Sequence, residues 1–123
     1  MKLTLDKVVA GYAALQRIGG EKMPIKIAYD IQRNMRIMQP DANQYDQQRI
    51  ELIKTKYGTR DEKDNWTVVP EKIGEFTKEM ATLGEAEVDI DIHTIELNNF
   101  KTDIAPLDLM ALEWMFVEEK KDE

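Results

Sequence analysis

The chain contains no cysteine and no serine, and His93 is its only histidine. Without cysteine, neither a disulfide framework nor a thiolate metal site can form, and a reducing compartment is the natural location. Hydrolysis through a Ser-His-Asp or Cys-His arrangement is close to excluded, because neither serine nor cysteine is present as the nucleophile. An acid–base pair among the 24 carboxylate side chains remains open, but no spacing favours one. We expect no cofactor and no enzymatic activity.

Long apolar runs are also missing. None approaches the roughly 18 residues of a membrane-spanning helix. Residues 1–15 are interrupted by Asp6 and Lys7, whereas a signal peptide needs an unbroken apolar stretch. We therefore expect a soluble protein that is not secreted by a signal peptide and does not bind membranes.

Positive charge is scarce, because 17 Lys and Arg residues stand against 24 Asp and Glu, for a formal net charge of −7. Such a balance repels phosphate backbones, so we expect no direct nucleic-acid binding and favour a protein partner. The 123 residues, 42% of them hydrophobic, suit one domain. We predict a single α+β domain over residues 1–117 and a charged, fraying tail over residues 118–123.

Apolar residues at helical spacing predict a helical hairpin in the first half of the chain. The spacing over residues 5–15 predicts a first helix, with Thr4 as its N-cap and glycines at 19 and 20 as its end. A second stripe runs from Pro24 to residue 57, where Gly58 is placed as a left-handed residue after the helix. This helix would be about 50 Å long and would fold back on the first.

Pro40 lies in the middle of the second stripe. A proline inside a helix removes a hydrogen bond and clashes with the preceding turn, at a cost of ~3 kcal/mol, yet the apolar phase resumes unchanged after it. Two interpretations stay open: a kink in one helix, or a break with Pro40 as the first residue of the next helix.

A short β element is predicted over residues 85–97, because apolar and acidic residues alternate there. One face carries Val88, Ile90 and Ile92, and the other carries Glu87, Asp89, Asp91 and His93. The alternation slips at residues 93–94, which indicates a bulge or bend. Residues 66–69 form a weaker strand candidate after a polar loop.

Two shorter helices complete the prediction. One begins at Pro70 and ends at Gly84, with a buried stripe of Ile73, Phe76, Met80 and Leu83. The other begins at Pro106 and runs through Phe116. The predicted fold class is thus α+β, mainly helical, with a long kinked helix in an αα-hairpin, one short β element and an apolar C-terminal helix.

Four sequence blocks resemble a group of small, uncharacterised proteins encoded by tailed bacteriophages and prophages. They are MPIKIAYDIQRNMRIM, YDQQRIELIKTKYGTRDE, EKIGEFTKEMATLGEAEVDIDI and IAPLDLMALEWMF, and they span nearly the whole chain. The resemblance implies a phage origin, a location in the host cytoplasm or the virion, and a non-enzymatic role. It implies no functional residue, and Pro40 departs from the uninterrupted helix of the group.

The weak candidates for a metal site are Asp89, Asp91 and His93, with Glu87 as a fourth ligand. The alternative is the solvated face of a half-buried strand, whose charges also discourage pairing with other edges. Neighbours on one face of a strand are roughly 7 Å apart, too far for a tight mononuclear site. We therefore favour the solvated face.

Two surfaces are candidates for partner binding. The long helix is locally basic, either as a solvated face with intrahelical pairs to Asp30, Asp46 and Glu51 or as a docking stripe for an acidic partner. The basic residues are Arg33 and Arg36, with Lys26, and further along Arg49, Lys54 and Lys56. The C-terminal helix is apolar around most of its circumference, so part of it is either wrapped by the domain or offered to another chain. Its candidate interface residues are Leu107, Met110, Trp114, Met115 and Phe116.

The function favoured by these features is binding to another protein, or self-association, as a virion, assembly or accessory component without catalysis. The alternative is a host-directed inhibitor whose acidic strand face occupies a basic groove. A metal-binding enzyme built on the acidic strand is the third possibility.

Overall fold

The computed structural model describes residues 1–100 and 103–117, and it confirms a mainly helical α+β fold. The predicted charged tail lies outside the described residues. The helices are α1 (Leu5–Ile18), α2 (Ile25–Leu52), α3 (Ile73–Gly84) and α4 (Pro106–Leu112). The strands are β1 (Lys2–Thr4), β2 (Gly58–Arg60), β3 (Trp66–Val68), β4 (Glu87–Asp89), β5 (Ile95–Glu96) and β6 (Phe116–Val117).

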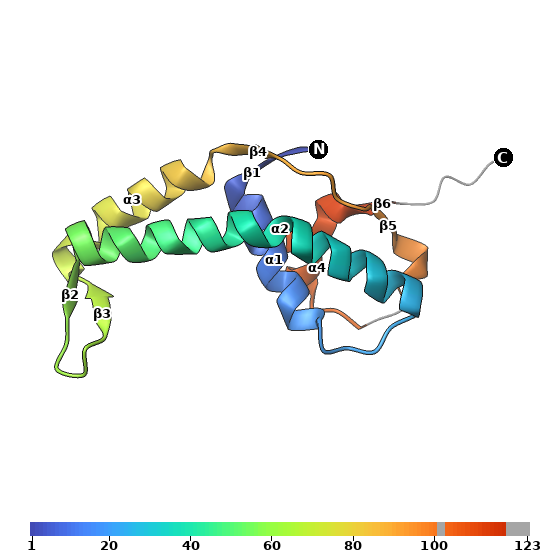
Figure 1. Ribbon diagram of the computed structural model, residues 1–123, viewed down its shortest axis with the longest axis horizontal. Coiled ribbons are helices and arrows are strands. Elements are labelled where there is room, and N and C mark those ends of the chain that lie inside the picture. The colour runs from blue at the N-terminus through green and yellow to red at the C-terminus, as the bar shows by residue number, and fades with distance from the viewer. Residues whose placement is uncertain (101–102, 118–123) are drawn as a thin grey trace.

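The long helix α2 joins two parts of the molecule (Figure 1). Its first half packs with α1 and α4 and with the segment from β4 to β5. Its second half projects away from them, carries the β2–β3 hairpin at its far end, and is followed back by α3. We call the first part the core and the second part the arm.

Helix α2 continues through Pro40, so the interpretation of a break with a new helix starting there is wrong. Pro40 is on the exposed side, where water can hydrate the carbonyl left without its helical partner. Met38 and Ala42 flank it on the buried side, and their packing holds the helix in phase. The helix then ends in a π-helical segment, Ile53–Tyr57, close to the predicted end at residue 57.

The expectation of one β element is too simple, because the described residues contain three two-stranded sheets. β1 pairs antiparallel with β4, with Leu3 opposite Val88, and β2 pairs antiparallel with β3 as a hairpin. β5 pairs in parallel with β6. Strands of two or three residues are too short for their periodicity to be read. The predicted element of residues 85–97 is divided into β4 and β5, and the residues between these two strands, which include the predicted bend at 93–94, belong to neither strand.

Gly58 is not left-handed, as predicted, but extended, with φ −111°. Its lack of a side chain is still required, because a Cβ there would lie 2.3 Å from the Ile53 carbonyl oxygen. Ile73 was also misplaced in the buried stripe of α3, since it is 50% exposed. The arm is only two helices thick, so α2 covers only one side of α3.

The C-terminal helix is shorter than predicted, since α4 ends at Leu112 and a 3₁₀ turn, Glu113–Met115, follows it. The chain then becomes β6, because the backbone of Phe116 and Val117 pairs with β5. This pairing draws the last predicted turn out of the helix.

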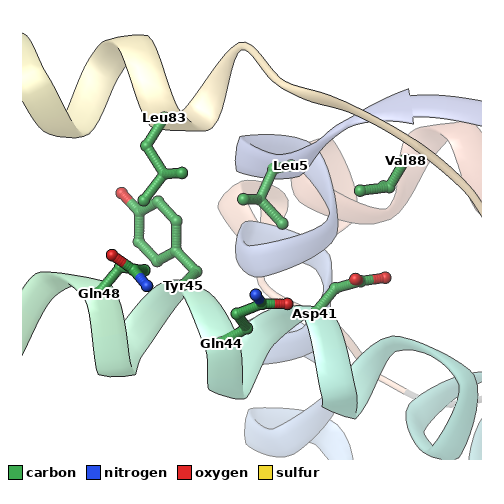
Figure 2. Close-up of a pocket in the computed structure, with 7 residues that line it drawn as sticks. All are labelled: Leu5, Asp41, Gln44, Tyr45, Gln48, Leu83 and Val88. Atoms are coloured by element: carbon green, nitrogen blue, oxygen red, sulfur yellow. The ribbon is translucent and has the colours of Figure 1, made fainter.

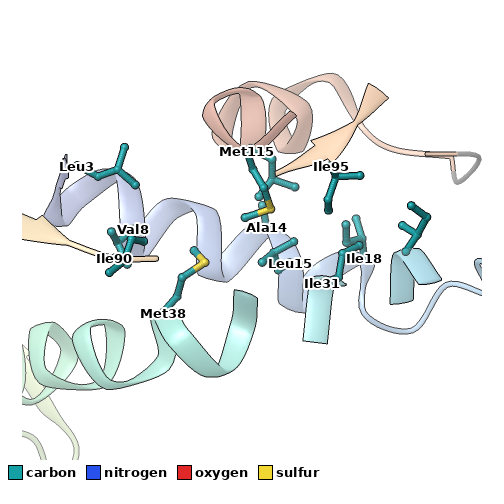
Figure 3. Close-up of a cluster of buried hydrophobic side chains, with 12 residues drawn as sticks. Leu3, Val8, Ala14, Leu15, Ile18, Ile31, Met38, Ile90, Ile95 and Met115 are labelled. Carbon is teal, nitrogen blue, oxygen red and sulfur yellow. The ribbon is translucent and has the colours of Figure 1, made fainter. Parts of the chain in front are cut away.

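Helix α1 lies at the centre of the core, in contact with α2, α3 and α4. Figure 3 shows apolar side chains of α1 meeting those of α2, of the segment after β4 and of the turn after α4. The fully buried members include Val8, Ala14, Met38, Leu112 and Met115. Gly11 permits this close packing, because a Cβ there would lie 2.9 Å from the Trp114 ring and 3.1 Å from the Met38 methyl carbon.

Candidate protein-binding surfaces

A buried amide fixes the segment that follows β4. Asn34 is fully buried on α2, its Nδ2 donates to the His93 carbonyl oxygen at 2.8 Å, and its Oδ1 accepts from the His93 N–H at 2.7 Å. The side chain thereby replaces the neighbouring strand that the extended backbone lacks at this point. Sequence reasoning missed this role, although Asn34 lies on the buried face of α2 together with Ile27, Ile31 and Met38.

The acidic strand face is exposed as predicted, but it is partly neutralised. Glu87, Asp89 and Asp91 are all exposed, whereas Val88 and Ile90 turn inward. The amino-terminal NH3⁺ of Met1 pairs with Asp89 Oδ1 at 3.1 Å. Lys2 stands directly opposite Asp89 in the β1–β4 register. This face is therefore less acidic than the sequence suggests.

The metal-site candidates do not converge in the structure. Across residues 1–100 and 103–117, no three His, Cys, Asp or Glu side chains come together in a way that could hold a metal ion. Asp89 instead binds the amino terminus, and the backbone of His93 is held by Asn34. The same described residues contain no helix with the length and apolarity needed to cross a membrane.

The C-terminal candidates divide between core and surface. Met115 is fully buried and so cannot contribute an exposed contact, whereas Trp114 and Phe116 are half-buried. Leu107 and Met110 are 77% and 67% exposed, one helical turn apart on α4. We call Leu107 and Met110 the α4 apolar surface.

Helix α4 is anchored beneath that surface by an ion pair. Arg17 Nε on α1 donates to Asp108 Oδ1 at 2.6 Å, and the Asp108 side chain is 13% exposed. Asp108 also lies in the first turn of α4, where a carboxylate complements the helix dipole. Beside α4, a shallow hollow of about 180 Å³ is lined by Leu97, Leu109, Glu113, Phe116 and Val117. The apolar side chains that line this hollow are thus accessible beside a helix whose position is fixed by an ion pair.

The basic residues of α2 lie on its solvent side. Within the described residues, neither Arg33 nor Arg36 makes an ion pair with a carboxylate, whereas further along α2 Arg49 pairs with Asp46 at 2.8 Å, one of the intrahelical pairs that were expected. The Arg33 guanidinium instead lies over the Tyr29 ring, 5.5 Å from its centroid. Tyr29, Gln32, Arg33, Arg36 and Ile37 line a shallow hollow.

A cavity of about 270 Å³ opens where the arm leaves the core (Figure 2). Leu5 of α1, Leu83 of α3 and Val88 of β4 supply apolar walls, and the Tyr45 ring rises from α2 toward Leu83. The polar side of the cavity is formed by Asp41, Gln44 and Gln48, all from α2. Sequence reasoning missed it, since its lining comes from four elements.

The arm carries its own ionic cluster, in which Lys56 and Tyr57 both donate hydrogen bonds to Glu79 Oε1 on α3, the tyrosine at 2.5 Å. The Lys56 hydrogen bond, with that of Tyr57 second, lowers the pKa of Glu79. The pKa of Lys56 is raised to about 12, chiefly by its bond to Glu79. The same carboxylate raises the pKa of Tyr57, because ionisation would cost the tyrosine this hydrogen bond. The cluster fastens α3 to the end of α2.

Comparison with protein-family models, with curated proteins and with solved structures finds no match to this chain.

Proposed function

We propose that the protein is a small phage-encoded, protein-binding component of virion assembly, or an accessory factor, that acts without catalysis. The observation that carries this proposal is the α4 apolar surface, where Leu107 and Met110 are 77% and 67% exposed. Two neighbouring large apolar side chains on one rigid helix favour a protein contact, since methionine and aromatic residues are enriched at interface cores.

The neighbourhood of these residues supports the same proposal. The hollow beside α4, lined in part by Leu109, Phe116 and Val117, adds further apolar surface next to the same helix. The ion pair between Arg17 and Asp108 holds α4 in place before any partner arrives, so little ordering entropy is lost on binding. The phage assignment is supported by the sequence blocks that resemble small phage proteins.

Site-specific photo-crosslinking in cells that produce the phage tests the proposal. A benzophenone amino acid at position 107 or 110 should capture a phage-encoded protein or a second copy of this chain. The matched control is position 47, an exposed glutamine on α2 away from α4. Crosslinking at 107 and 110 no stronger than at 47 would overturn the role of this surface.

A second experiment, with a variant of the α4 apolar surface, separates loss of binding from loss of stability. Leu107→Asp with Met110→Asp should leave the melting temperature nearly unchanged, because both side chains are exposed. The same double variant should fail to support particle assembly when it replaces the parent. Normal assembly with the double variant would contradict the proposal.

A further inference from the structure

The solvent side of α2 carries an unusual combination of side chains near its start. Ile25 is 88% exposed and Tyr29 is 55% exposed, although the opposite side of the helix is buried through Ile27 and Ile31. Helical spacing places Ile25, Tyr29, Arg33 and Arg36 on one solvent-facing strip. We call these four residues the α2 stripe. It presents an apolar projection next to two guanidinium groups that lack carboxylate partners within the described residues.

The cavity at the base of the arm has the opposite character. Its apolar walls are Leu5, Leu83 and Val88, and the Asp41 carboxylate lies in its lining without an ion pair among the described residues. Asp6 packs against Gly84, next in sequence to the lining residue Leu5, but its Oδ1 already accepts hydrogen bonds from the Thr4 hydroxyl and the Lys7 N–H, so Asp41 supplies the free carboxylate. The cavity is thus apolar within and acidic at its edge.

The two features match in size and in chemistry. A volume of about 270 Å³ is several times the roughly 30 Å³ that one water occupies in the liquid, so it has room for a large side chain. The amides of Gln44 and Gln48 offer hydrogen-bond partners for a phenol hydroxyl. Arginine binds carboxylates in a fork geometry, and Asp41 is placed to accept such a contact.

Tyr29 cannot reach the cavity of its own chain. Tyr29 and Asp41 are twelve residues apart on the same continuous helix. At 1.5 Å per residue they are separated by about 18 Å along its axis. Arg36 is nearer to Asp41, at about 7.5 Å along the axis, but the two make no ion pair among the described residues. The Tyr29 ring can therefore enter such a cavity only in a second molecule.

We propose that two copies of this chain associate head to tail, with Tyr29 of one copy entering the arm-base cavity of the next. Ile25 covers the apolar edge of that cavity, and Arg33 and Arg36 approach the Asp41 carboxylate. After the first contact, the copy that contributed its stripe keeps its cavity free, and the copy that contributed its cavity keeps its stripe free. Such a heterologous contact builds a closed ring or an open filament. It does not use the α4 apolar surface.

Sedimentation velocity over a range of protein and salt concentrations tests the contact. The parent should form species larger than a dimer, and the association should weaken as salt screens the arginine–carboxylate pairs. A stripe variant, Arg33→Glu with Arg36→Glu, and a cavity variant, Asp41→Lys, should each weaken association about tenfold or more. Tyr29→Ala should act like the stripe variant. Gln44→Lys is a second cavity variant, at an exposed position, in case Asp41→Lys folds poorly.

Mixing the two defective proteins gives the sharpest result. The stripe variant retains an intact cavity and the cavity variant retains an intact stripe, so their equimolar mixture should form dimers and nothing larger. Matched charge changes on exposed residues away from both surfaces, Lys54→Glu with Lys63→Glu and Glu62→Lys, should leave association unchanged.

Three outcomes would overturn the proposal. The parent could remain monomeric at its highest soluble concentration, its association could survive both charge reversals, or the mixture could fail to form dimers. Association that is lost instead in Leu107→Asp with Met110→Asp would assign self-assembly to α4 and refute the stripe. Loss of the stripe contact alone would leave the proposed α4 function standing, so the two failures are distinguishable.

Discussion

Replacing Asn34 by alanine should be among the most damaging changes in the core. Asn34 is fully buried, and both ends of its amide bind the backbone of His93, at 2.7 and 2.8 Å. The substitution removes two hydrogen bonds worth about 1 kcal/mol each and leaves two backbone groups poorly satisfied, for a total loss of about 2–4 kcal/mol. Alanine recovers up to about 0.7 kcal/mol through its higher helix propensity.

The net effect should be a loss of about 2–3 kcal/mol in the free energy of unfolding, which is a large share of the stability of a small domain. For a chain of this size, that corresponds to a decrease of about 10 °C in melting temperature. Asn43→Ala is the matched control, because Asn43 is exposed on the same helix and the change in propensity is identical. Calorimetry and urea unfolding measure both variants. Equal melting temperatures for Asn34→Ala and Asn43→Ala would refute the stabilising role of the Asn34–His93 hydrogen bonds.

Asn34→Asp gives an independent check through pH. An ionised aspartate can accept from the His93 N–H but cannot donate to the His93 carbonyl oxygen, whereas a protonated aspartate can do both. Burial and this carbonyl should raise the folded-state pKa of the new carboxyl above its unfolded value of about 3.9. The deficit relative to the parent should therefore be largest at neutral pH and should shrink as pH falls toward that unfolded value. A deficit independent of pH would contradict the assigned hydrogen bonds.

Three further changes test other parts of the structure. Pro40→Ala should raise the melting temperature, since it removes a helix clash of up to ~3 kcal/mol at an exposed position; a decrease would show that the proline is required. Glu79→Gln should lower the free energy of unfolding at neutral pH, and this difference from the parent should vanish as pH falls through the lowered pKa of Glu79, because a carboxyl with a lowered pKa stabilises the fold only while it is ionised. Stability curves of parent and variant that stay parallel with pH would argue against the pair with Lys56. Gly58→Ala should destabilise the arm, because the new Cβ would lie 2.3 Å from the Ile53 carbonyl oxygen. Hydrogen exchange of the β2–β3 hairpin should then be faster than in the parent, and an unchanged exchange rate would contradict this prediction.

The helical part of the fold was predictable because its signals are local and repeated. The spacing in residues 5–15 and the glycines at 19 and 20 set the bounds of α1, and the stripe through Pro40 gave the course of α2. The strands were less accessible, since β1 pairs with β4 and β5 with β6, each across a long stretch of sequence, although β2 and β3 form a local hairpin. A periodicity of two cannot be recognised in two or three residues.

The candidate surfaces were predictable only in part. Leu107 and Met110 were expected to be available to a partner and are exposed, but Met115 in the same list is buried because the chain leaves the helix at Leu112. The cavity at the arm base could not be derived, since it depends on how four elements meet. The role of the exposed Tyr29 could not be predicted, because single apolar residues on the solvent side of a helix do not follow the periodicity of its buried face.

The cavity follows from the backbone contact that joins the arm to the core. Gly84, at the end of α3, approaches Asp6 so closely that a Cβ would lie 3.0 Å from the Asp6 Cβ. The Leu5 N–H then donates to the Ala86 carbonyl oxygen, which continues the β1–β4 pairing into the start of α1. These contacts fix α3 to α1, whereas α3 faces the middle of α2 through side chains such as Leu83, which lies beside the Tyr45 ring. The cavity between α2 and α3 next to this junction therefore results from how the backbone of the fold is arranged. Helix α2 supplies one wall of the cavity and also the stripe that is proposed to fill the cavity of the next copy.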